Sequence, residues 1–437
     1  MASIVVIGGG LAGLTCAWRL QRAGHDVEVL ERDSEVGGRM RSERRGDFVI
    51  ERGAQFVASG YHQVHALAAQ LGLGNRIRPH EVTRDAVLAG GVVRSLDLAR
   101  PWRAMASSGL AMRSLPLLGR LGVELLRHWG SLDPAHPERA AALDGEDLAR
   151  GLRRLGGAEL FESLLAPSFA ATFDDDPNEL SFAFGLLMLR LMAQGASLQS
   201  FAGGNGTLTA ALARRVPVLT GCDVRRVETE TDGARISLVR RGGESRVFAD
   251  AVVVAVPGCA VPALCPKLAP EERSFFEAVE YSRGILVHLL LDRAPPVPAY
   301  SGIAFARSEG LDLYGVAFEH HEPDAAPRGA GCVNAALTRE ASERMWNATD
   351  AELARHVCDE LARTPCGPLA PASVVVHRWD PLLPRFTPGA LRRLAAFRRR
   401  LERSPRIAFA GDYLVSPTLE GAVGSGIRAA ADVSTTL

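Results

Sequence analysis

The chain has 437 residues, 47 % hydrophobic and 23 % charged, which excludes a disordered chain, a collagen and a coiled coil. Fifty basic residues balance fifty acidic ones, and this zero net charge predicts no nucleic-acid partner. The seven cysteines show no CxxC spacing, so we expect reduced thiols in a cytoplasmic protein rather than disulfides or a zinc site. No uninterrupted apolar run reaches about 18 residues, which predicts no membrane-spanning helix.

The N-terminal segment has the pattern of one β-α-β unit. Residues 4–7 are apolar and β-branched, which predicts a strand, and a helix over 11–22 and a second strand over 27–30 follow. Gly24 stands where a helix C-terminus needs a left-handed residue. Such a crossover builds a parallel sheet with ligands at the carboxyl ends of its strands, so the expected fold class is α/β.

A glycine fingerprint connects the first strand to its helix. Residues 8–13 satisfy G-x-G-x-x-G directly after a strand and before a helix, the context that the motif requires. Gly8 permits the tight turn, Gly10 lets a pyrophosphate approach the backbone, and Gly13 lets helix and strand pack closely. Glu31, at the end of the second strand, is placed to accept hydrogen bonds from a ribose diol, which argues against NADP.

The middle of the chain changes to helical patterns and then to strands. From Arg76 to Phe201, stretches rich in Leu, Ala and Arg predict a helical insertion. We expect breaks in it at Pro101, Pro116, 133–137, Pro167 and Pro177. After the glycine-rich residues 203–206, the patterns predict a helix over 208–214, strands over 223–228, 235–240, 251–256, 285–291, 314–318, 374–378 and 407–410, and a last helix from near Glu420.

A second glycine pair indicates which dinucleotide to expect. Gly37-Gly38-Arg39 follows Glu31, and a glycine pair with an arginine allows a loop to close over a diphosphate. From Ile4 through Arg39 the sequence resembles the flavoprotein superfamily of monoamine and polyamine oxidases, protoporphyrinogen oxidases and phytoene desaturases, in which this pattern is specific for FAD. We expect noncovalent FAD, because no Cys or His lies in the final cofactor loop.

Further segments resemble this superfamily over nearly the whole chain. Residues 51–56 are similar to the segment beside the flavin, and Val224 to the residue that holds the adenine. Residues 411–412 and 420–426 resemble the last cofactor motif, in which an acid binds the ribityl chain and a helix N-terminus faces the flavin. The FAD-binding residues that the resemblance implies are Gly8, Gly10, Leu11, Ala12, Gly13, Glu31, Arg32, Gly37, Gly38, Arg39, Gly53, Ala54, Gln55, Phe56, Val224, Trp379, Gly411, Asp412, Glu420, Gly421 and Ala422.

The resemblance also implies two interleaved domains within the α/β class. A Rossmann-like FAD-binding domain is assembled from the discontinuous segments 1–75, 203–270 and 395–437. An α+β substrate-binding domain takes residues 76–202, which are mostly helical, and 271–394.

The helical insertion resembles that of protoporphyrinogen oxidases. The shared features are a helix with Leu-x-x-Pro at 164–167 and an Asp-Pro turn before Leu180-Ser181. Asp174-Asp175 stands where an alanine-glycine pair is usual, and Phe386 replaces a tyrosine. Many flavin amine oxidases carry a lysine on the strand that matches 285–291, whereas this chain has none there. Its only lysine, Lys267, lies in a proline-rich turn and is expected on the surface.

No catalytic residue is assigned, and the candidates are His288, Trp379 and Gln55. His288 could accept a proton in front of the flavin, but a hydrogen-bonded packing residue is the favoured interpretation. Trp379 fits one wall of an aromatic pocket and core packing equally well. We expect no metal: the pairs His320-His321 and His62-x-x-His65 lack a completing carboxylate cluster, and adjacent histidines on a strand point in different directions.

Residues 101–130 leave two interpretations open. They could form a helical hairpin on the cytoplasmic face of a bilayer, collecting lipophilic substrate, or core helices with solvated arginines, which we favour. The predicted function is an FAD-dependent oxidoreductase that takes hydride from a C–H bond of a reduced, largely apolar small molecule, with oxygen or a quinone as electron acceptor. A flavin amine oxidase and a carotenoid or terpenoid desaturase are the alternatives. Escort proteins of the same fold bind lipidated partners without catalysis, but the complete diphosphate and ribityl signature argues against that role.

Overall fold

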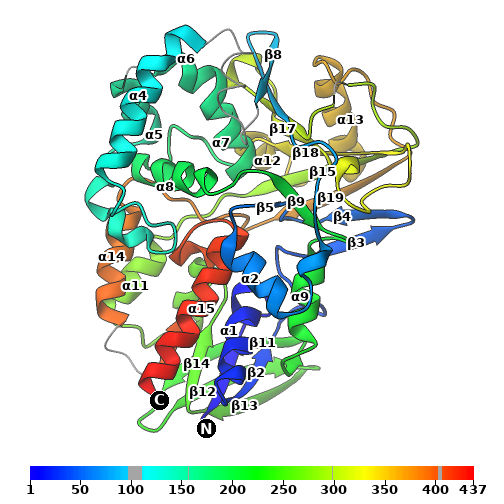
Figure 1. Ribbon diagram of the computed structural model, residues 1–437. Coiled ribbons are helices and arrows are strands. Elements are labelled where there is room, and N and C mark those ends of the chain that lie inside the picture. The colour runs from blue at the N-terminus through cyan, green and yellow to red at the C-terminus, as the bar shows by residue number, and fades with distance from the viewer. Residues whose placement is uncertain (97–110, 156, 298, 402–405) are drawn as a thin grey trace.

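The computed structural model describes residues 1–96, 111–155, 157–297, 299–401 and 406–437 (Figure 1). A parallel sheet with its helices forms the lower part of the molecule in Figure 1, helices α4 to α8 lie at the upper left, and a second large sheet lies at the upper right. Both termini lie at the bottom, below the parallel sheet. The expected α/β class is confirmed.

Five parallel strands carry the N-terminal glycine turn, in the order β10-β2-β1-β14-β20. Alternate side chains of a strand point to opposite faces. Ile4 and Val6 therefore pack in the core that contains α1 and α15, whereas Val5 and Ile7 pack in a second core with Val224. The bounds are β1 (Ser3–Ile7), α1 (Leu11–Arg22), β2 (Asp26–Leu30), β10 (Val218–Leu219), β14 (Ala251–Val254), β20 (Ile407–Phe409) and α15 (Leu419–Thr436).

Helices α1 and α15 lie side by side on one face of this sheet (Figure 1). Their backbones approach so closely that a Cβ on Gly426 would lie 2.4 Å from the carbonyl oxygen of Ala12. An antiparallel sheet and a group of helices cover the other face. These are β11 (Cys222–Thr229), β12 (Ala234–Arg240), β13 (Gly243–Ala249), α10 (Val261–Leu264), α11 (Pro270–Glu277) and α14 (Ala390–Leu401).

The second large sheet has seven strands in the order β19-β15-β18-β17-β16-β7-β8. The strand β15, second from one edge, is buried throughout, with Val287 and Leu289 packed toward helices α12 and α13. Leu290 points to the opposite face and packs on Ile50 of the β3–β4 hairpin. The bounds are β3 (Ser42–Arg45), β4 (Phe48–Glu51), β7 (Asp85–Ala89), β8 (Val92–Leu96), β15 (Gly284–Leu291), β16 (Gly302–Phe305), β17 (Leu313–Phe318), β18 (Gly331–Leu337), α12 (Arg339–Arg344), α13 (Asp350–Ala362) and β19 (Ser373–Trp379).

A helical region and a small sheet connect the two large sheets. The small sheet consists of β5 (Val57–Ala58), β9 (Leu198–Phe201) and β6 (Ile77–Pro79). In the chain, α2 (His62–Gln70) lies between β5 and β6, and α9 (Gly206–Ala213) follows β9. The helical region comprises α4 (Ala111–Arg127), α5 (Leu148–Arg154), α6 (Ala158–Leu160), a π-helical turn (Phe161–Leu165), α7 (Ala166–Phe173) and α8 (Phe182–Ala193).

The helical insertion differs from its prediction in four places. Residues 77–79, 85–89 and 92–96 form strands, and β7 pairs with β16 and extends the seven-stranded sheet. Residues 198–201 form β9, which pairs with β6. Pro116 lies inside α4 without breaking it, since the helix buries Leu117 and Leu121 in the core. Pro167 also lies within a continuous helical run, directly after the π-helical turn, which accommodates the missing N–H group.

Other predictions for the insertion agree with the structure. Residues 133–136 and Pro177 are not helical, and Gly24 is left-handed with φ +90°. Pro101 lies outside the described residues. Within the described parts of the chain, no helix is long and apolar enough to cross a membrane.

Candidate functional site

The glycine turn between β1 and α1 forms an open, donor-rich loop. Gly8 has φ +108°, and its N–H donates to the Leu30 carbonyl at 2.8 Å. A Cβ on Gly13 would lie 2.0 Å from the carbonyl oxygen of Gly8, so only glycine fits there. A Cβ on Gly10 would meet nothing within 4 Å, and no side chain caps α1. The loop therefore offers space and backbone N–H groups to an anion.

Glu31 fixes the other side of this loop. Its Oε2 accepts the Gly9 N–H at 2.6 Å, and its Oε1 accepts the Asp33 N–H at 2.8 Å. The Cys222 N–H donates to the Glu31 carbonyl at 2.8 Å, which starts β11 beside this loop and places Val224 two residues further on. Neighbouring Arg32 is exposed, and its Nε lies 3.8 Å from a carboxylate oxygen of Asp33. Glu31 and Val224 are thus close to the glycine turn, whereas the Arg32 side chain reaches solvent.

The loop that carries the second glycine motif, Gly37-Gly38, packs against the glycine turn between β1 and α1. The Gly37 N–H donates to the Gly9 carbonyl at 2.8 Å, and Gly38 adopts φ +54° with its missing Cβ only 3.6 Å from Gly10 Cα. Arg39 then reaches across the molecule: its Nη1 lies 2.9 Å from Asp412 Oδ2 and donates to the Leu382 carbonyl at 2.6 Å. Asp412 is buried, with 6 % exposure. This pair holds a guanidinium beside the loop, where it can neutralise a phosphate charge.

The segment 51–56 is fixed through its backbone by side chains from distant elements. Trp379 Nε1 on β19 donates to the Arg52 carbonyl at 2.6 Å, and Asn205 Nδ2 donates to the Ala54 carbonyl at 3.1 Å. A Cβ on Gly53 would lie 2.5 Å from the Arg39 carbonyl oxygen. Trp379 and Gln55, two of the candidates from the sequence, therefore lie at this segment, and both are partly exposed.

The N-terminus of α15 is also preorganised. The Thr418 hydroxyl caps it by accepting the Gly421 N–H at 2.9 Å, and the Ala422 N–H donates to the Thr418 carbonyl at 3.0 Å. The Glu420 carboxylate turns away from its own helix and accepts the N–H groups of Gln63 and Val64 at the start of α2. Gly411, directly before Asp412, donates its N–H to Ser425 Oγ at 2.8 Å. The carboxylate of Glu420 thus stabilises α2.

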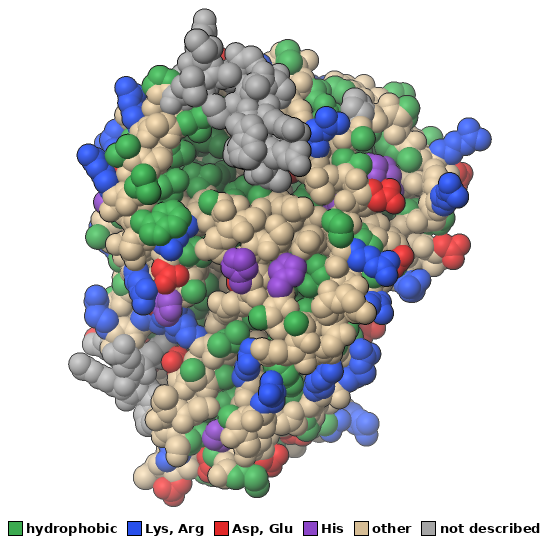
Figure 2. Space-filling model, viewed as in Figure 1, with side chains coloured by type: hydrophobic (Ala, Val, Ile, Leu, Met, Phe, Trp, Pro, Cys, Tyr) green, Lys and Arg blue, Asp and Glu red, His purple; other side chains and the backbone are tan. Residues whose placement is uncertain are grey.

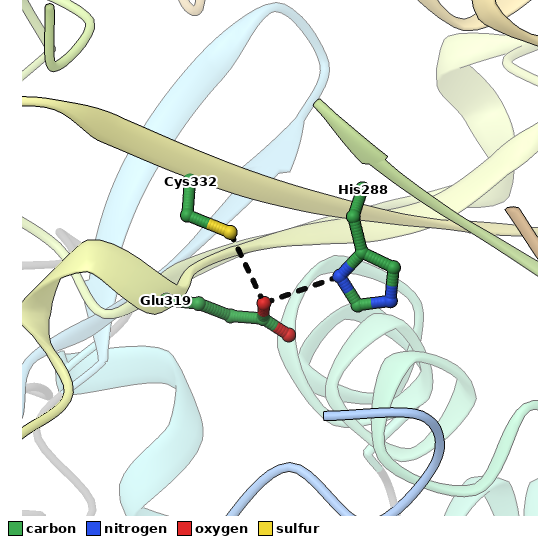
Figure 3. Close-up of side chains that lie close together, drawn as sticks. All are labelled: His288, Glu319 and Cys332. Atoms are coloured by element: carbon green, nitrogen blue, oxygen red, sulfur yellow. Dashed lines mark hydrogen bonds and ion pairs between the residues drawn. The ribbon is translucent and has the colours of Figure 1, made fainter. Parts of the chain in front are cut away.

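His288, the third candidate from the sequence, lies apart from the segment 51–56. It belongs to an enclosed cluster between the seven-stranded sheet and the β3–β4 hairpin. Figure 3 shows that three side chains point toward one another: His288 of β15, Cys332 of β18, and Glu319, which begins a short 3-10 helix after β17. Glu319 Oε2 accepts from His288 Nδ1 at 3.2 Å and from the Cys332 thiol at 3.3 Å, and its Oε1 accepts from Asn334 Nδ2 at 2.9 Å. His288 has 0 % exposure. Its imidazole is therefore enclosed in a hydrogen-bonded network, as the favoured interpretation expected.

Electrostatics keep Glu319 ionised. Burial alone would raise its pKa, but the interaction with His288 and the three hydrogen-bond donors bring the pKa below its ordinary value. Burial and neighbouring Glu319 raise the pKa of the Cys332 thiol well above its ordinary value. The cluster is thus an ionised carboxylate that accepts hydrogen bonds from an imidazole, an amide and a neutral thiol.

The structure corrects one argument against a metal and brings together a group that the sequence analysis did not consider. The ligand atoms of His288, Glu319 and Cys332 lie within 4.8 Å of one another, although this set includes neither of the histidine pairs. His320 and His321 lie on a short 3-10 helix (Glu319–His321), with ring centroids 4.3 Å apart, and not on a strand. The ligand types and spacing fit a divalent cation, but hydrogen bonds already pair all three side chains. That the chain binds no metal stays a prediction.

Sequence reasoning missed that several acids gather at the segment 51–56, of which Glu51 is buried and Glu322 is partly exposed. Glu51 accepts from Ser42 Oγ at 2.9 Å and from the Asn205 N–H at 2.8 Å, yet burial raises its pKa to about 8. Glu322 follows the short helix that carries Glu319 and accepts from Ser200 Oγ at 3.0 Å. Only Glu51 stood in a motif that the sequence singled out. Glu319 lies on a short 3-10 helix and Glu322 follows it, and both reach this segment through the packing of distant elements, which leaves no local signal.

The departures in the helical insertion have structural roles. Asp174 ends α7 in the left-handed conformation, φ +49°, where a glycine would be usual. Asp175 is buried and lies 2.8 Å from Arg385 and 3.6 Å from Arg339. Phe386 stacks on Phe184 of α8, with ring centroids 4.9 Å apart. Lys267 is exposed and lies 3.4 Å from Glu228, as predicted.

The chain is similar in sequence and in fold to known flavin-dependent oxidoreductases. The model of the family "flavin containing amine oxidoreductase" matches residues 11–434. A coproporphyrinogen III oxidase of Mycobacterium tuberculosis is 26 % identical, covering 99 % of this chain and 97 % of the relative. A hydroxysqualene dehydroxylase of Rhodopseudomonas palustris is also 26 % identical, covering 98 % and 97 %. The structure of cyclohexylamine oxidase from Brevibacterium oxydans IH-35A superimposes with a TM-score of 0.77 at 21 % identity, covering 99 % of both chains, and shares the fold.

Proposed function

The chain belongs to the flavin-containing amine oxidoreductases, and we propose that it oxidises a reduced, largely apolar small molecule, resembling a porphyrinogen, with noncovalent FAD as hydride acceptor. Membership of the family confirms the predictions of an oxidoreductase and of a flavin cofactor. Bound FAD supplies a two-electron acceptor at its N5 atom. The chain's own residues bind it, orient the substrate and exclude water.

One observation carries the assignment of the cofactor site: four separated segments meet around the open glycine loop. The Gly10 position leaves room, Glu31 is held at the edge of the loop, and Arg39 is paired with Asp412. An extended dinucleotide with a diphosphate needs such a set of donors, one cation and a ribose acceptor. We propose that the residues named for FAD from the sequence form this site, except that the Glu420 carboxylate and the Arg32 side chain act elsewhere.

The domain division follows from the same assignment. Residues 1–75, 203–270 and 395–437 would bind FAD, and 76–202 with 271–394 would bind substrate. Trp379 supports this division, because it belongs to β19 of the substrate part and donates to the Arg52 carbonyl beside the flavin segment. We propose Trp379 and Gln55 as residues at the border between the two.

A specific observation disfavours a lysine-dependent amine oxidase. The lysine-bearing strand of such enzymes corresponds to β15, where this chain has the enclosed His288. Lys267 lies on the surface beside Glu228 and has no path to the site. An amine or a terpenoid substrate remains the alternative, supported by the family description and by the hydroxysqualene dehydroxylase relative.

We further propose a peripheral contact with the cytoplasmic face of a membrane and either oxygen or a quinone as electron acceptor. Figure 2 shows hydrophobic side chains on the upper left of the molecule, over the helical region. Val123, Leu126 and Trp129, in and just after α4, are 49 %, 73 % and 47 % exposed. Apolar side chains in such a row fit the interface of a lipid bilayer. Residues 101–110 of the expected hairpin lie outside the described residues.

Product formation tests the proposed activity. The purified protein with FAD is incubated with coproporphyrinogen III or protoporphyrinogen IX in air, and porphyrin fluorescence is followed against a protein-free control. Porphyrin formation that needs the flavoprotein supports the proposal. If the rate with protein equals that of spontaneous oxidation for both porphyrinogens, the porphyrinogen assignment is wrong.

A further inference from the structure

A polar cluster borders the segment 51–56 and takes no part in the proposed FAD contacts. Ser200 on β9 is its centre, with Oγ 2.8 Å from His80 Nε2 and 3.0 Å from Glu322 Oε2. The same hydroxyl lies 3.4 Å from the carbonyl oxygen of Gln55. Since Gln55 belongs to the segment proposed beside the flavin, the cluster lies at the edge of the proposed substrate site.

Glu322 differs from its neighbours in accessibility. Ser200, His80 and Glu319 are buried, with 1 %, 8 % and 2 % exposure, whereas Glu322 is partly exposed. Among the described residues its carboxyl group has a single hydrogen-bond partner, Ser200, and that bond uses Oε2. The other oxygen, Oε1, is thus available to a ligand.

The pKa values of Glu319 and Glu322 are shifted in opposite directions. Glu319 is held ionised by His288, so a second negative charge at Glu322 would face both Glu319 and Glu51. Burial and these two carboxyls raise the pKa of Glu322 well above its ordinary value. The nearby imidazoles do not compensate, because burial lowers the pKa values of His80, His320 and His321.

We propose that Glu322 is a specificity-determining residue whose carboxyl group, held by Ser200, accepts a hydrogen bond from an N–H group of the substrate. This inference rests on the proposed function, because it requires the substrate to lie beside residues 51–56. A pyrrole or an amine brings an N–H donor to a cluster rich in carboxyl groups. A hydrocarbon offers no donor to Oε1, and polar sites of this kind reject analogues that lack the donor. We therefore expect Glu322 to favour substrates that present an N–H group.

The test measures anaerobic flavin reduction in the FAD-loaded protein with coproporphyrinogen III, cyclohexylamine and hydroxysqualene as probes. We expect a nitrogen-bearing probe to reduce the wild-type flavin. Glu322→Ala should raise its half-saturating concentration about tenfold or more, the equivalent of one good hydrogen bond. Glu322→Gln should stay within about threefold of wild type, because its carbonyl oxygen accepts the same bond. Ser200→Ala should give an intermediate loss.

Asp85→Asn is the matched control. Asp85 is likewise a partly exposed residue whose carboxyl group has a raised pKa and is bound by a serine, Ser301, but it lies on β7 of the seven-stranded sheet. Its half-saturating concentration should equal that of wild type. FAD content and reduction by dithionite show that each variant is folded and loaded, and Ser200→Ala takes the place of Glu322→Ala if the latter loses FAD.

Several results would overturn the inference. They are an unchanged half-saturating concentration in Glu322→Ala, a loss in Glu322→Gln as large as in Glu322→Ala, or reduction of wild type by hydroxysqualene alone. In each of these cases the proposed flavin-dependent oxidation still stands. If dithionite reduces the wild-type flavin but none of the probes does, the proposed function itself fails, and the inference fails with it.

Discussion

The Arg39 guanidinium lies 2.9 Å from the Asp412 carboxylate and joins the N-terminal glycine loops to the last loop of the chain. Both residues lie at the carboxyl edge of the parallel sheet, where ligands of such folds bind. The pair leaves further donors of the guanidinium for a phosphate, because only Nη1 is used by Asp412 and the Leu382 carbonyl.

Removing this pair should weaken flavin binding. Arg39→Ala deletes a charge-assisted donor and leaves Asp412 buried without its cation, so we expect the dissociation constant for FAD to rise about 10- to 100-fold. Flavin fluorescence titration of the apoprotein measures it. Arg45→Ala, which removes an exposed ion pair with Glu43, is the control and should bind FAD normally. Equal affinity in Arg39→Ala would mean that Arg39 only ties the chain together.

Glu31→Arg should lower the affinity for the adenosine half of FAD while the fold persists. The change removes the acceptor proposed for the ribose, and it also removes the contacts to the Gly9 and Asp33 N–H groups. We expect a loss of about tenfold or more in FAD affinity with an unchanged far-UV circular dichroism spectrum. If the affinity does not change, Glu31 serves only to shape the loop.

Asp174 should make the protein less stable as the pH rises. Burial and nearby Asp175 raise its pKa to about 7, so the folded state binds more protons than the unfolded state between the two pKa values. Stability from this group is therefore lost from about pH 4 upward and is fully lost above about pH 7. Asp174→Asn keeps a residue that tolerates the left-handed conformation and removes the charge.

The stability of this variant can be compared with wild type across pH. We expect Asp174→Asn to raise Tm by about 2 °C at pH 8 and to leave it nearly unchanged at pH 4. The difference between the two proteins isolates Asp174 from other buried acids such as Glu51. A Tm difference that is the same at both pH values would show that the carboxyl group does not titrate in this range.

Lys267→Met should leave flavin reduction unchanged. The lysine is exposed and pairs only with Glu228 on β11, so its loss removes one surface ion pair. The rate of anaerobic flavin reduction by the best substrate measures the effect. A reduction rate that falls severalfold would give Lys267 a role that its position does not suggest and would favour a lysine-dependent mechanism.

The sequence predicted the local parts of the fold well. The strand, glycine turn and helix of residues 3–22 follow from patterns within a few residues, and the helix ends as predicted. The strands β6, β7 and β8 were missed, because β6 pairs with β9 and β7 pairs with β16, whose residues lie more than one hundred and more than two hundred positions away. Pro116 was misjudged since burial of Leu117 and Leu121 outweighs the lost hydrogen bond.

In the candidate site, too, the local motifs could be predicted from the sequence and the long-range contacts could not. Glycine motifs have fixed spacing and could be found in the sequence, whereas Glu322 and Ser200 have ordinary neighbours and meet only because elements far apart in the chain pack together. The role of the Glu420 carboxylate at the start of α2 was equally invisible, because it depends on a helix far away in the chain. Asp174-Asp175 was recognised as a departure, but its contact with Arg385 required the structure.

The central claim, that bound FAD takes hydride from a reduced and largely apolar substrate, is tested most directly by anaerobic flavin bleaching. The oxidised holoprotein is mixed without oxygen with protoporphyrinogen IX, coproporphyrinogen III, a terpenoid alcohol and a panel of amines, and the loss of flavin absorbance is followed. We predict rapid bleaching by a porphyrinogen, with at most about one porphyrin formed for every three flavins reduced, because a porphyrinogen loses six electrons in all and each FAD accepts two. Rapid bleaching by an amine alone, with no reaction of either porphyrinogen, would contradict this account and favour an amine oxidase.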